Sequence, residues 1–458
     1  MRHPWRAAMA RNVTLLAGLT GVLLYATVHW GGVVREDRDV YLFALGAIVL
    51  FAGLLRSGTE RAPRLSPIFR WLLPLLPAWA ILQIIPLPSG LVAALSPARG
   101  QVLGMLGPAG GATPYTSLSV FPSGTLQNLL LISGYVAVFL LVRELMWFFS
   151  DRPWLLVLPL IGIATWQAVI GMIQYWSANN GVARGNYANR DHFAGLLELT
   201  LPFAVVYPIG FFRVSDRRSG IQVSDALKMS ASWAIAAALL VGIMFSLSRM
   251  GFLSALFSLL VTGFLAVFSL QVTRRIATPA MKWAAIGLIA LLGLGTFLFL
   301  PPDQLVERFS RLSTDEGIDK GRAELWGETL SLVRAYPVFG CGLGGYESAF
   351  PKYKVSGPLV RDNYAHNDYL QFLAEMGIMG AAILFVLAGA TVRAAFRSAL
   401  DTSNPHTWTL ALGCAGSLSA ILLHSTADFN LSIPANAMVV SWIAGIATSV
   451  SYDNVIQE

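Results

Sequence analysis

Tyr364–Gly377 reads YAHNDYLQFLAEMG and stands where a long polar stretch meets an apolar one. The polar stretch extends from about Pro301 to Gly380, and it is the only long one in a chain that is otherwise mostly apolar. It brings His366 to the start of an apolar helix, and imidazole is the side chain that titrates nearest to neutral pH. We therefore expect any chemistry of this protein to take place there.

The composition is that of a membrane protein. Of the 458 residues, 55% are hydrophobic and only 12% are charged, whereas a soluble domain has about 25% charged residues. The formal net charge is +7, but the basic residues fall in short clusters between apolar runs. Such clusters indicate orientation in a membrane rather than a nucleic-acid surface, so we expect contact with membrane lipid and no nucleic-acid partner.

Apolar runs of about 17 to 25 residues, enough to cross a hydrocarbon layer of about 30 Å, follow one another along the chain. They predict an all-α integral membrane protein with about twelve transmembrane helices and one long, partly helical loop between helices nine and ten. The predicted spans are 12–31, 39–56, 68–87, 125–146, 154–175, 192–212, 231–248, 250–271, 283–301, 371–393, 408–427 and 433–450. The chain then divides into scaffold helices (1–150), helices joined by short arginine-bearing turns (151–301), the large loop (302–370) and C-terminal helices (371–458).

The basic residues alternate from one connection to the next. Connections on one side of the membrane carry eighteen Arg and Lys residues, and the short connections on the other side carry six. By the positive-inside rule, both termini are cytoplasmic and the long loop lies outside. Four prolines predict a kink in the third span: Pro74, Pro77, Pro86 and Pro88. The segment 88–124, rich in Gly, Pro and Ser, is predicted to be a surface loop.

Three arginines are candidate anion ligands on the outer side. Arg249 lies in the short turn SRMG between helices seven and eight, and Arg190 lies just before helix six. An arginine at such a position is either an anchor that reaches for lipid phosphates or a receptor for a substrate anion. Arg322 begins the predicted amphipathic helix GRAELWGETLSLVRAYP, where a cation opposes the helix dipole unless an anion is near, although a solvated surface arginine is equally consistent.

Histidine offers the candidate base. His366 can accept a proton from a hydroxyl group at working pH, although a single histidine is often structural. His192 and His424 are predicted on the same side of the membrane. No HExxH motif, cysteine pair or carboxylate cluster indicates a bound metal. The glycines of VFGCGLGGYESAFPKY predict a tight turn rather than a dinucleotide site, because no strand–turn–helix context surrounds them.

Several of these motifs, taken together and in order, resemble one known family. They are RGNYANRDHFAG, SLSRMG, GRAELW, YPVFGCGLGGYESAFPKY, AHNDYLQFLAEMGIMG and HSTADFNLSIPANA, and they span about Gln174 to Ser432. On these motifs the chain resembles the O-antigen ligase and polymerase superfamily, which are membrane glycosyltransferases of the GT-C type. The family usually has a glycine where Met250 follows Arg249.

The resemblance implies transfer of a glycan from undecaprenyl pyrophosphate to an acceptor hydroxyl on the periplasmic face of the bacterial inner membrane. It implies an inverting reaction without metal or cofactor, and a lateral groove between apolar helices for the polyprenyl tail. The resemblance assigns pyrophosphate binding to Arg249, Arg322 and Arg190 and the role of general base to His366. Three further polar residues would orient the base or bind sugar: Asn367, Asp368 and Glu375.

The resemblance leaves the acceptor open. A ligase transfers to lipid A core, a polymerase to another lipid-linked glycan, and a protein O-oligosaccharyltransferase to Ser or Thr; we favour the ligase. A lipid-linked glycan flippase or other transporter is the alternative from another class. Transporters carry ionisable groups near the membrane midplane, often on inverted repeats, whereas here the polar clusters lie at one face and no repeat is visible.

Overall fold

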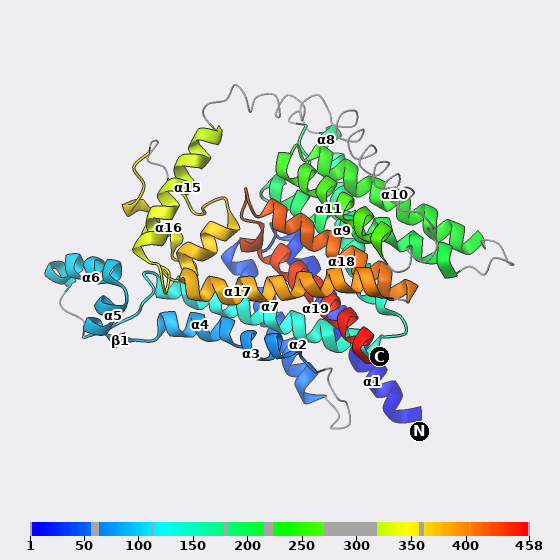
Figure 1. Ribbon diagram of the computed structural model, residues 1–458, viewed down its shortest axis with the longest axis horizontal. Helices are drawn as coiled ribbons and strands as arrows, with labels where there is room; N and C mark the ends of the chain where they lie inside the picture. Colours follow the sequence, from blue (N-terminus) through cyan, green and yellow to red (C-terminus); the bar gives the residue numbers. More distant parts are fainter. Residues whose placement is uncertain are drawn as a thin grey trace.

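The computed structural model describes residues 2–55, 64–110, 114–177, 181–214, 223–269, 318–356, 361–402 and 404–456. Within these ranges the chain is almost entirely helical (Figure 1), and the one sheet is a short antiparallel pair, β1 (Leu87–Pro88) and β2 (Tyr115–Thr116). Nine of the described helices are long and apolar enough to cross a membrane. The prediction of an all-α, multi-pass membrane protein is confirmed.

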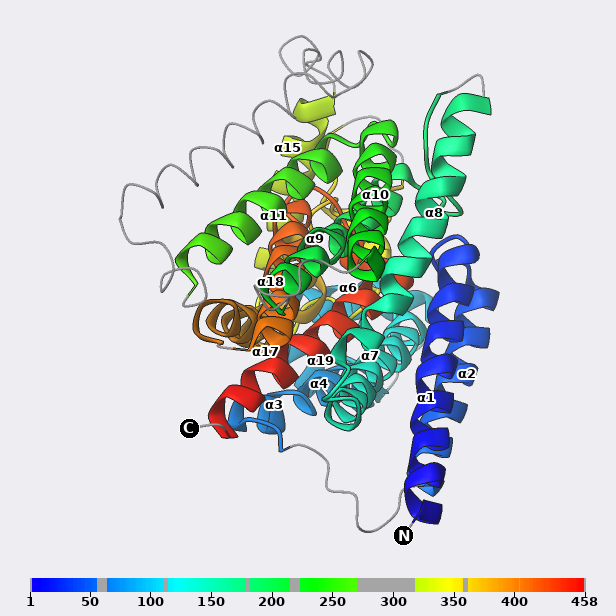
Figure 2. The ribbon, with the colours of Figure 1, turned by 90° about the vertical axis from the view of Figure 1, so that its right-hand side faces the viewer.

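The first third of the chain contributes an edge and part of one side of the bundle. Its helices are α1 (Arg2–Val28), α2 (Arg35–Leu54), α3 (Pro67–Leu72), α4 (Leu75–Ile84) and α7 (Pro122–Phe148). α1 and α2 lie side by side along one edge (Figure 2), and α4 packs along α7. The third predicted span is broken between α3 and α4 at Pro74, which has no backbone N–H to continue the helix, so the predicted kink is confirmed.

Two helices form the buried centre. In α9 (Arg190–Val214) and α18 (Pro405–His424), 83% and 78% of the residues in the apolar 18-residue stretch are buried. They pack closely because Gly413 of α18 leaves room for the ring of Phe203, from which an added Cβ would lie only 2.3 Å away. The helices around them are α8 (Leu158–Ser177), α10 (Val223–Phe245), α11 (Arg249–Phe268), α17 (Asp368–Asp401) and α19 (Pro434–Ile456), with 3-10 turns η1 (Pro153–Leu156) and η4 (Asn430–Ser432).

The predicted spans coincide with these helices, although several ends differ, as in α10 and α17. The predicted ninth span, 283–301, lies outside the described residues. Figures 1 and 2 show both chain ends at the end of the bundle opposite α15 (Ile318–Ala335), and in Figure 1 they also lie opposite α5 (Ser89–Leu95) and α6 (Pro97–Gly110). The structure thus places both termini at one end and the described part of the long loop at the other.

The segment 88–124 is not the surface loop that we predicted. It forms α5, α6 and the two short strands, and its last part packs against the loop that follows α15. Ser119 donates its backbone N–H to the carbonyl of Gln83, and Val120 donates to the carbonyl of Cys341. Backbone N–H groups of this segment thus donate to carbonyls of other parts of the chain, which the polar and glycine-rich composition alone does not reveal.

The predicted amphipathic helix and the predicted glycine turn are both confirmed. α15 buries Leu325 and Thr329 and ends at Ala335, before Pro337. Leu330, which helical spacing also predicts on the apolar face, is 39% exposed. The chain then passes through α16 (Tyr346–Ala349) and η3 (Phe350–Lys352). In the turn before α16, the backbone of Gly340 lies directly against that of Gly377, where α17 is kinked.

Both glycines of this contact should be irreplaceable. Gly340 and Gly377 have positive φ values of 72° and 65°, and a Cβ on Gly377 would lie 2.3 Å from the carbonyl oxygen of Val338. We expect Gly377→Ala to destabilise the fold by about 2 kcal/mol or more, through backbone strain and steric overlap. The measurement is the thermal unfolding midpoint in detergent. Gly327→Ala, at an open position in α15, is the matched control and should be neutral or slightly stabilising; equal midpoints for the two variants would contradict the prediction.

Candidate functional site

His366 lies at the N-terminal end of α17, where its neighbours fix the backbone. The carbonyl of Ala365 accepts a 3.0 Å hydrogen bond from Trp326 Nε1. Asn367 caps α17 by accepting from the N–H of Leu370, and its Nδ2 donates to the carbonyl of Thr426. His366 itself has φ of 49°, a strained value for a residue other than glycine. Its side chain is 40% exposed, so the imidazole is both held in place and accessible.

The carboxylate of Asp428 is the centre of the site. Its Oδ1 lies 3.7 Å from His366 Nδ1 and 3.8 Å from His192 Nε2, and its Oδ2 lies 3.7 Å from His424 Nε2. The three imidazoles come from the loop before α17, from α9 and from the end of α18. Burial alone would raise the pKa of Asp428, but the three imidazoles lower this pKa well below its ordinary value. Asp428 therefore stays a carboxylate beside His366.

A second carboxylate lies behind this group. Glu198 of α9 is fully buried and its two oxygens lie 2.9 and 3.0 Å from Nδ1 of His424. From the sequence, His192 and His424 are predicted on the outer side, but neither Asp428 nor Glu198 is predicted as a site residue. A signal for Glu198 exists, because an acidic residue inside an apolar span is costly unless it is paired. For Asp428 the signal is weaker, namely its place four residues after His424 within a quoted motif.

The three polar residues predicted to orient the base or bind sugar make mainly structural contacts. Asp368 Oδ2 accepts from the hydroxyl of Ser425 at 2.8 Å and from the N–H of Leu431 at 3.1 Å. Glu375 Oε1 accepts from Gln371 Nε2 at 2.9 Å. With Asn367 as the cap of α17, these residues hold the loops around His366. Their roles towards a substrate stay predictions.

Two of the candidate arginines begin neighbouring helices. Arg190 is the first residue of α9 and Arg249 the first residue of α11. The two helix ends touch, because an added Cβ on Gly251 would lie 2.5 Å from the Cβ of Ala194. His192, one of the partners of Asp428, lies between Arg190 and this contact in the sequence. Two helix N-termini with partial positive charge, each with an arginine, are suited to bind an anion.

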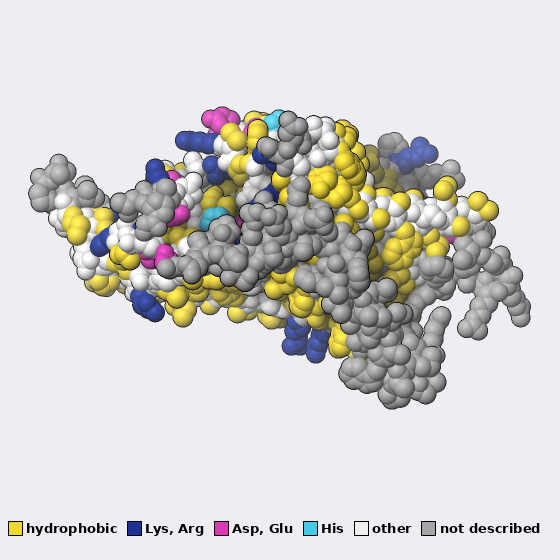
Figure 3. Space-filling view, turned by 90° about the horizontal axis from the view of Figure 1, so that it is seen from above, with side chains coloured by type: hydrophobic (Ala, Val, Ile, Leu, Met, Phe, Trp, Pro, Cys, Tyr) yellow, Lys and Arg dark blue, Asp and Glu magenta, His cyan; other side chains and the backbone are white. Residues whose placement is uncertain are grey.

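The third candidate arginine lies on α15. Arg322 precedes Trp326 by four residues in α15, so both project from the same face about 6 Å apart along the axis. Trp326 is bonded to Ala365, the residue before His366. The structure thus brings the elements that carry Arg190, Arg249, Arg322 and His366 to one end of the bundle. On the face seen in Figure 3, acidic, basic and histidine side chains gather towards the end where α15 lies.

Aromatic rings complete the surroundings of His366. The ring of Phe429 stacks on Tyr364 with centroids 4.2 Å apart, and it meets the rings of His366 and His192 edge-on at 4.8 and 4.6 Å. Within the described ranges, no group of three or more His, Cys, Asp or Glu residues is arranged to hold a metal ion.

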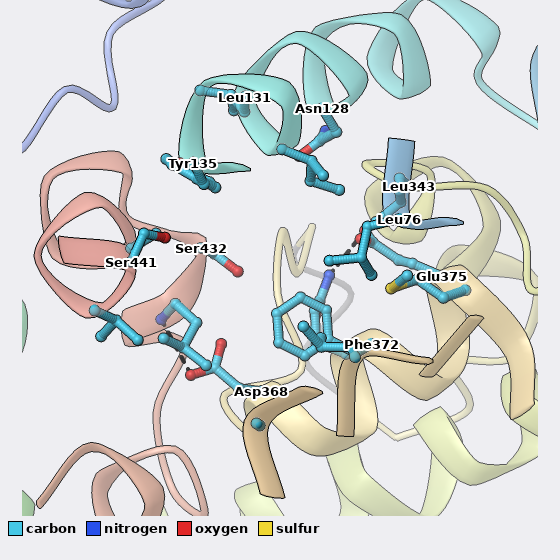
Figure 4. A pocket seen from close by; sticks show the side chains of 18 of the residues that line it. Leu76, Asn128, Leu131, Tyr135, Leu343, Asp368, Phe372, Glu375, Ser432 and Ser441 are labelled. Atoms are coloured by element: carbon cyan, nitrogen blue, oxygen red, sulfur yellow. Dashed lines mark hydrogen bonds between the residues drawn. The ribbon is translucent and has the colours of Figure 1, made fainter. Parts of the chain in front are cut away.

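A separate cavity of about 820 Å³ lies beside this group, between α4, α7, α17 and α19. Figure 4 shows Asn128 and Leu131 of α7 facing Asp368 and Phe372 of α17 across it. The described residues that line it include Tyr364 but none of the three candidate arginines. The cavity and the arginine-bearing helix ends are therefore different parts of the site.

Comparison with known families decides the assignment. The family described as O-antigen ligase matches residues 234–385, which include Arg249, Arg322 and His366. The chain carries an O-antigen ligase domain of the O-antigen ligase and polymerase superfamily. A search of curated proteins finds no match for the chain. Members of the O-antigen ligase family are membrane glycosyltransferases or ligases, so the resemblance found in the motifs is confirmed at the level of the family.

The Asp428 carboxylate should give this protein a defined acid sensitivity. Because its folded pKa lies below the ordinary value of about 3.9, its stabilising effect is present above about pH 4 and is lost as the pH falls through the folded value. We expect Asp428→Asn to unfold at a lower temperature than wild type at neutral pH, with the gap closing below about pH 4. Thermal unfolding followed by tryptophan fluorescence across this pH range checks the prediction. The control is Asp401→Asn, at the exposed end of α17. A difference in unfolding temperature between Asp428→Asn and wild type that stays the same at every pH would contradict the prediction.

Proposed function

We propose that this protein transfers a glycan from undecaprenyl pyrophosphate to an acceptor hydroxyl at the periplasmic face of the bacterial inner membrane. The proposed acceptor is lipid A core, and both chain termini are cytoplasmic. The observation that supports it most is the pairing of an accessible His366 with the buried Asp428, next to helix ends that carry arginines. His366 and Arg249 lie within the residues that match the O-antigen ligase family, whereas Asp428 and Arg190 lie outside them.

His366 is the proposed general base. With Nδ1 facing Asp428, its Nε2 accepts the proton of the acceptor hydroxyl, and Asp428 stabilises the imidazolium that forms. The acceptor oxygen then bonds to the anomeric carbon from the side opposite the leaving group. The bond from that carbon to the pyrophosphate oxygen breaks, and undecaprenyl pyrophosphate leaves with the electron pair. The product therefore has inverted configuration at the anomeric carbon.

The arginines are the proposed ligands of the leaving group. Negative charge grows on the pyrophosphate as the bond breaks, and planar guanidinium groups stabilise it with paired hydrogen bonds. Arg249 and Arg190 would act from the N-termini of α11 and α9, whose helix dipoles favour the same charge. Arg322 would act from α15. Because the cations are side chains, the proposed reaction uses neither metal nor cofactor.

A polymerase or a protein O-oligosaccharyltransferase would use the same groups with a different acceptor. Transport of a lipid-linked glycan is the second candidate function, and it is not an enzymatic one. The feature that favours it is the fully buried Glu198–His424 pair. A purified protein offered a polyprenyl-pyrophosphate glycan and a panel of acceptors separates these functions. A new glycosidic bond identifies the transferase and its acceptor, while movement of glycan across vesicles without such a bond identifies the transporter.

His366→Ala should abolish transfer. Loss of a general base typically lowers the rate by about 10²–10⁴-fold, and the side chain is half exposed, so folding should be preserved. The measurement is product formation in the presence of a chelator, together with the thermal unfolding midpoint. His406→Ala, at the exposed start of α18, is the control and should keep full activity. Residual activity close to wild type in His366→Ala would remove this residue from the proposed mechanism.

Arg249→Lys should impair turnover although the charge is kept. An ammonium group cannot make the two parallel hydrogen bonds that a guanidinium makes to a phosphate, so we expect a loss of about tenfold or more. The steady-state rate at saturating acceptor is the quantity to compare. The same change at the exposed Arg393 of α17 is the control and should leave the rate unaltered. Equal rates for both variants would exclude Arg249 as a pyrophosphate ligand.

A further inference from the structure

The cavity between α4, α7, α17 and α19 changes character along its length. On α7, the lining residues Gln127 and Asn128 near the N-terminus are amides, whereas Val136 and Phe139 farther along are apolar. The distance from Gln127 to Phe139 along the helix axis is about 18 Å. The same change occurs on α17, where Asp368, Gln371 and Glu375 are followed, beyond the kink, by Leu384 and Leu387. The cavity is thus amphiphilic, with its polar end near the start of α17.

The charges of the cavity do not suit a pyrophosphate. Its charged lining residues are one cation, Arg38, and three carboxylates, Glu347, Asp368 and Glu375. Arg190, Arg249 and Arg322 are absent from the described residues that line it. A diphosphate in this cavity would therefore meet three carboxyl groups, one of them already paired with Arg361, and only one guanidinium group. The polar end suits an uncharged, hydroxyl-rich group instead, because amides can donate to and accept from hydroxyl groups and carboxylates accept from them.

The polar end of the cavity reaches the candidate base through one aromatic layer. Tyr364 lines the cavity and stacks on Phe429, whose edge contacts the ring of His366. Ser425 and Asp368, which line the same end, are hydrogen-bonded to each other, and the N–H of Asp368 is bonded to the carbonyl of Asp428. A molecule in the cavity therefore approaches the His366–Asp428 pair from the side of α7 and α17. The helix ends with Arg190 and Arg249 belong to α9 and α11, which contribute no residue to the lining.

We propose that this cavity is the binding site of the acceptor, and that the acceptor is a membrane-anchored saccharide with an uncharged sugar at the His366 end. Its hydrocarbon chain lies along Val136, Phe139, Leu384 and Leu387. Because lipid tails are as apolar as leucine, moving the hydrocarbon chain from the bilayer into the cavity gains little free energy. The hydrocarbon chain therefore positions the acceptor, and the sugar contributes the affinity. The inference rests on the proposed transferase function. It assigns the first third of the chain, through α3, α4 and α7, a part in choosing the acceptor.

The test measures binding rather than transfer, so that it does not depend on activity. The protein in lipid nanodiscs is incubated with an alkyl glucoside that carries a photoactivatable diazirine in its alkyl chain, and cross-linked peptides are mapped by mass spectrometry. Unlabelled dodecyl glucoside, dodecanol and farnesyl diphosphate serve as competitors. We expect cross-links in the Val136–Phe139 and Leu384–Leu387 regions. Dodecyl glucoside should abolish these cross-links, whereas dodecanol and farnesyl diphosphate should leave their yield unchanged.

A variant that fills the cavity gives a second measurement. Ala388 of α17 lines the cavity, and Ala388→Phe should lower the cross-linking yield about tenfold because the added ring occupies the chain site. Ala382→Phe, at an exposed position of the same helix outside the lining, is the matched control and should keep the yield. Both variants are checked for an unchanged thermal unfolding midpoint.

Three outcomes would overturn the assignment. Competition by farnesyl diphosphate would make the cavity a site for a polyprenyl diphosphate, and competition by dodecanol equal to that by dodecyl glucoside would show that no sugar is recognised. Equal yields in Ala388→Phe and Ala382→Phe would place the probe outside the cavity. The proposed transferase function is tested separately. Transfer activity without sugar-dependent labelling would reject only the assignment of the cavity. Sugar-dependent labelling without any transfer activity would reject the proposed function and leave the cavity as a saccharide-binding site.

Discussion

The carboxylate of Asp428 joins the ends of three helices that are far apart in the sequence. It faces His192 at the start of α9, His424 at the end of α18 and His366 just before α17, and each imidazole nitrogen lies within 3.8 Å of one of its oxygens. A buried carboxylate needs such partners, because the transfer of an unpaired carboxylate out of water costs roughly several kcal/mol of free energy. Because one carboxylate faces all three imidazoles, Asp428 links the position of His366 to α9 and α18.

Rigid packing around this group keeps the loops in place. Asn436 donates to the carbonyl of His192 and accepts from the hydroxyl of Tyr187, which ties the start of α19 to the start of α9. On the other side, Trp326 of α15 and the glycines of the following turn fix the chain before and after the kink of α17. Loops that carry functional residues need such support from rigid elements, since a small misplacement of a base lowers the rate strongly.

The arrangement separates two kinds of chemistry on the two sides of His366. Arginines at helix N-termini lie on the side of α9 and α11, where an anion is stabilised by both side chains and helix dipoles. The amphiphilic cavity lies on the side of α4 and α7 and has carboxylates and amides at its polar end. In the proposed function, His366 is a base between an anion site and a site for a neutral sugar, and transfer from a lipid diphosphate to a hydroxyl requires such an arrangement.

The sequence by itself determined the membrane class, the position of the described spans, the amphipathic helix α15 and the glycine turn before α16, because these follow from local composition and periodicity. It also singled out His366 and the arginines, and it supplied the family. Only the tertiary structure placed Asp428 beside His366, paired Glu198 with His424 and turned the segment 88–124 into packed helices. The reason is physical: each of these features is a contact between residues far apart in the chain. Whether a buried carboxylate meets a histidine depends on how the helices pack, which local patterns do not encode.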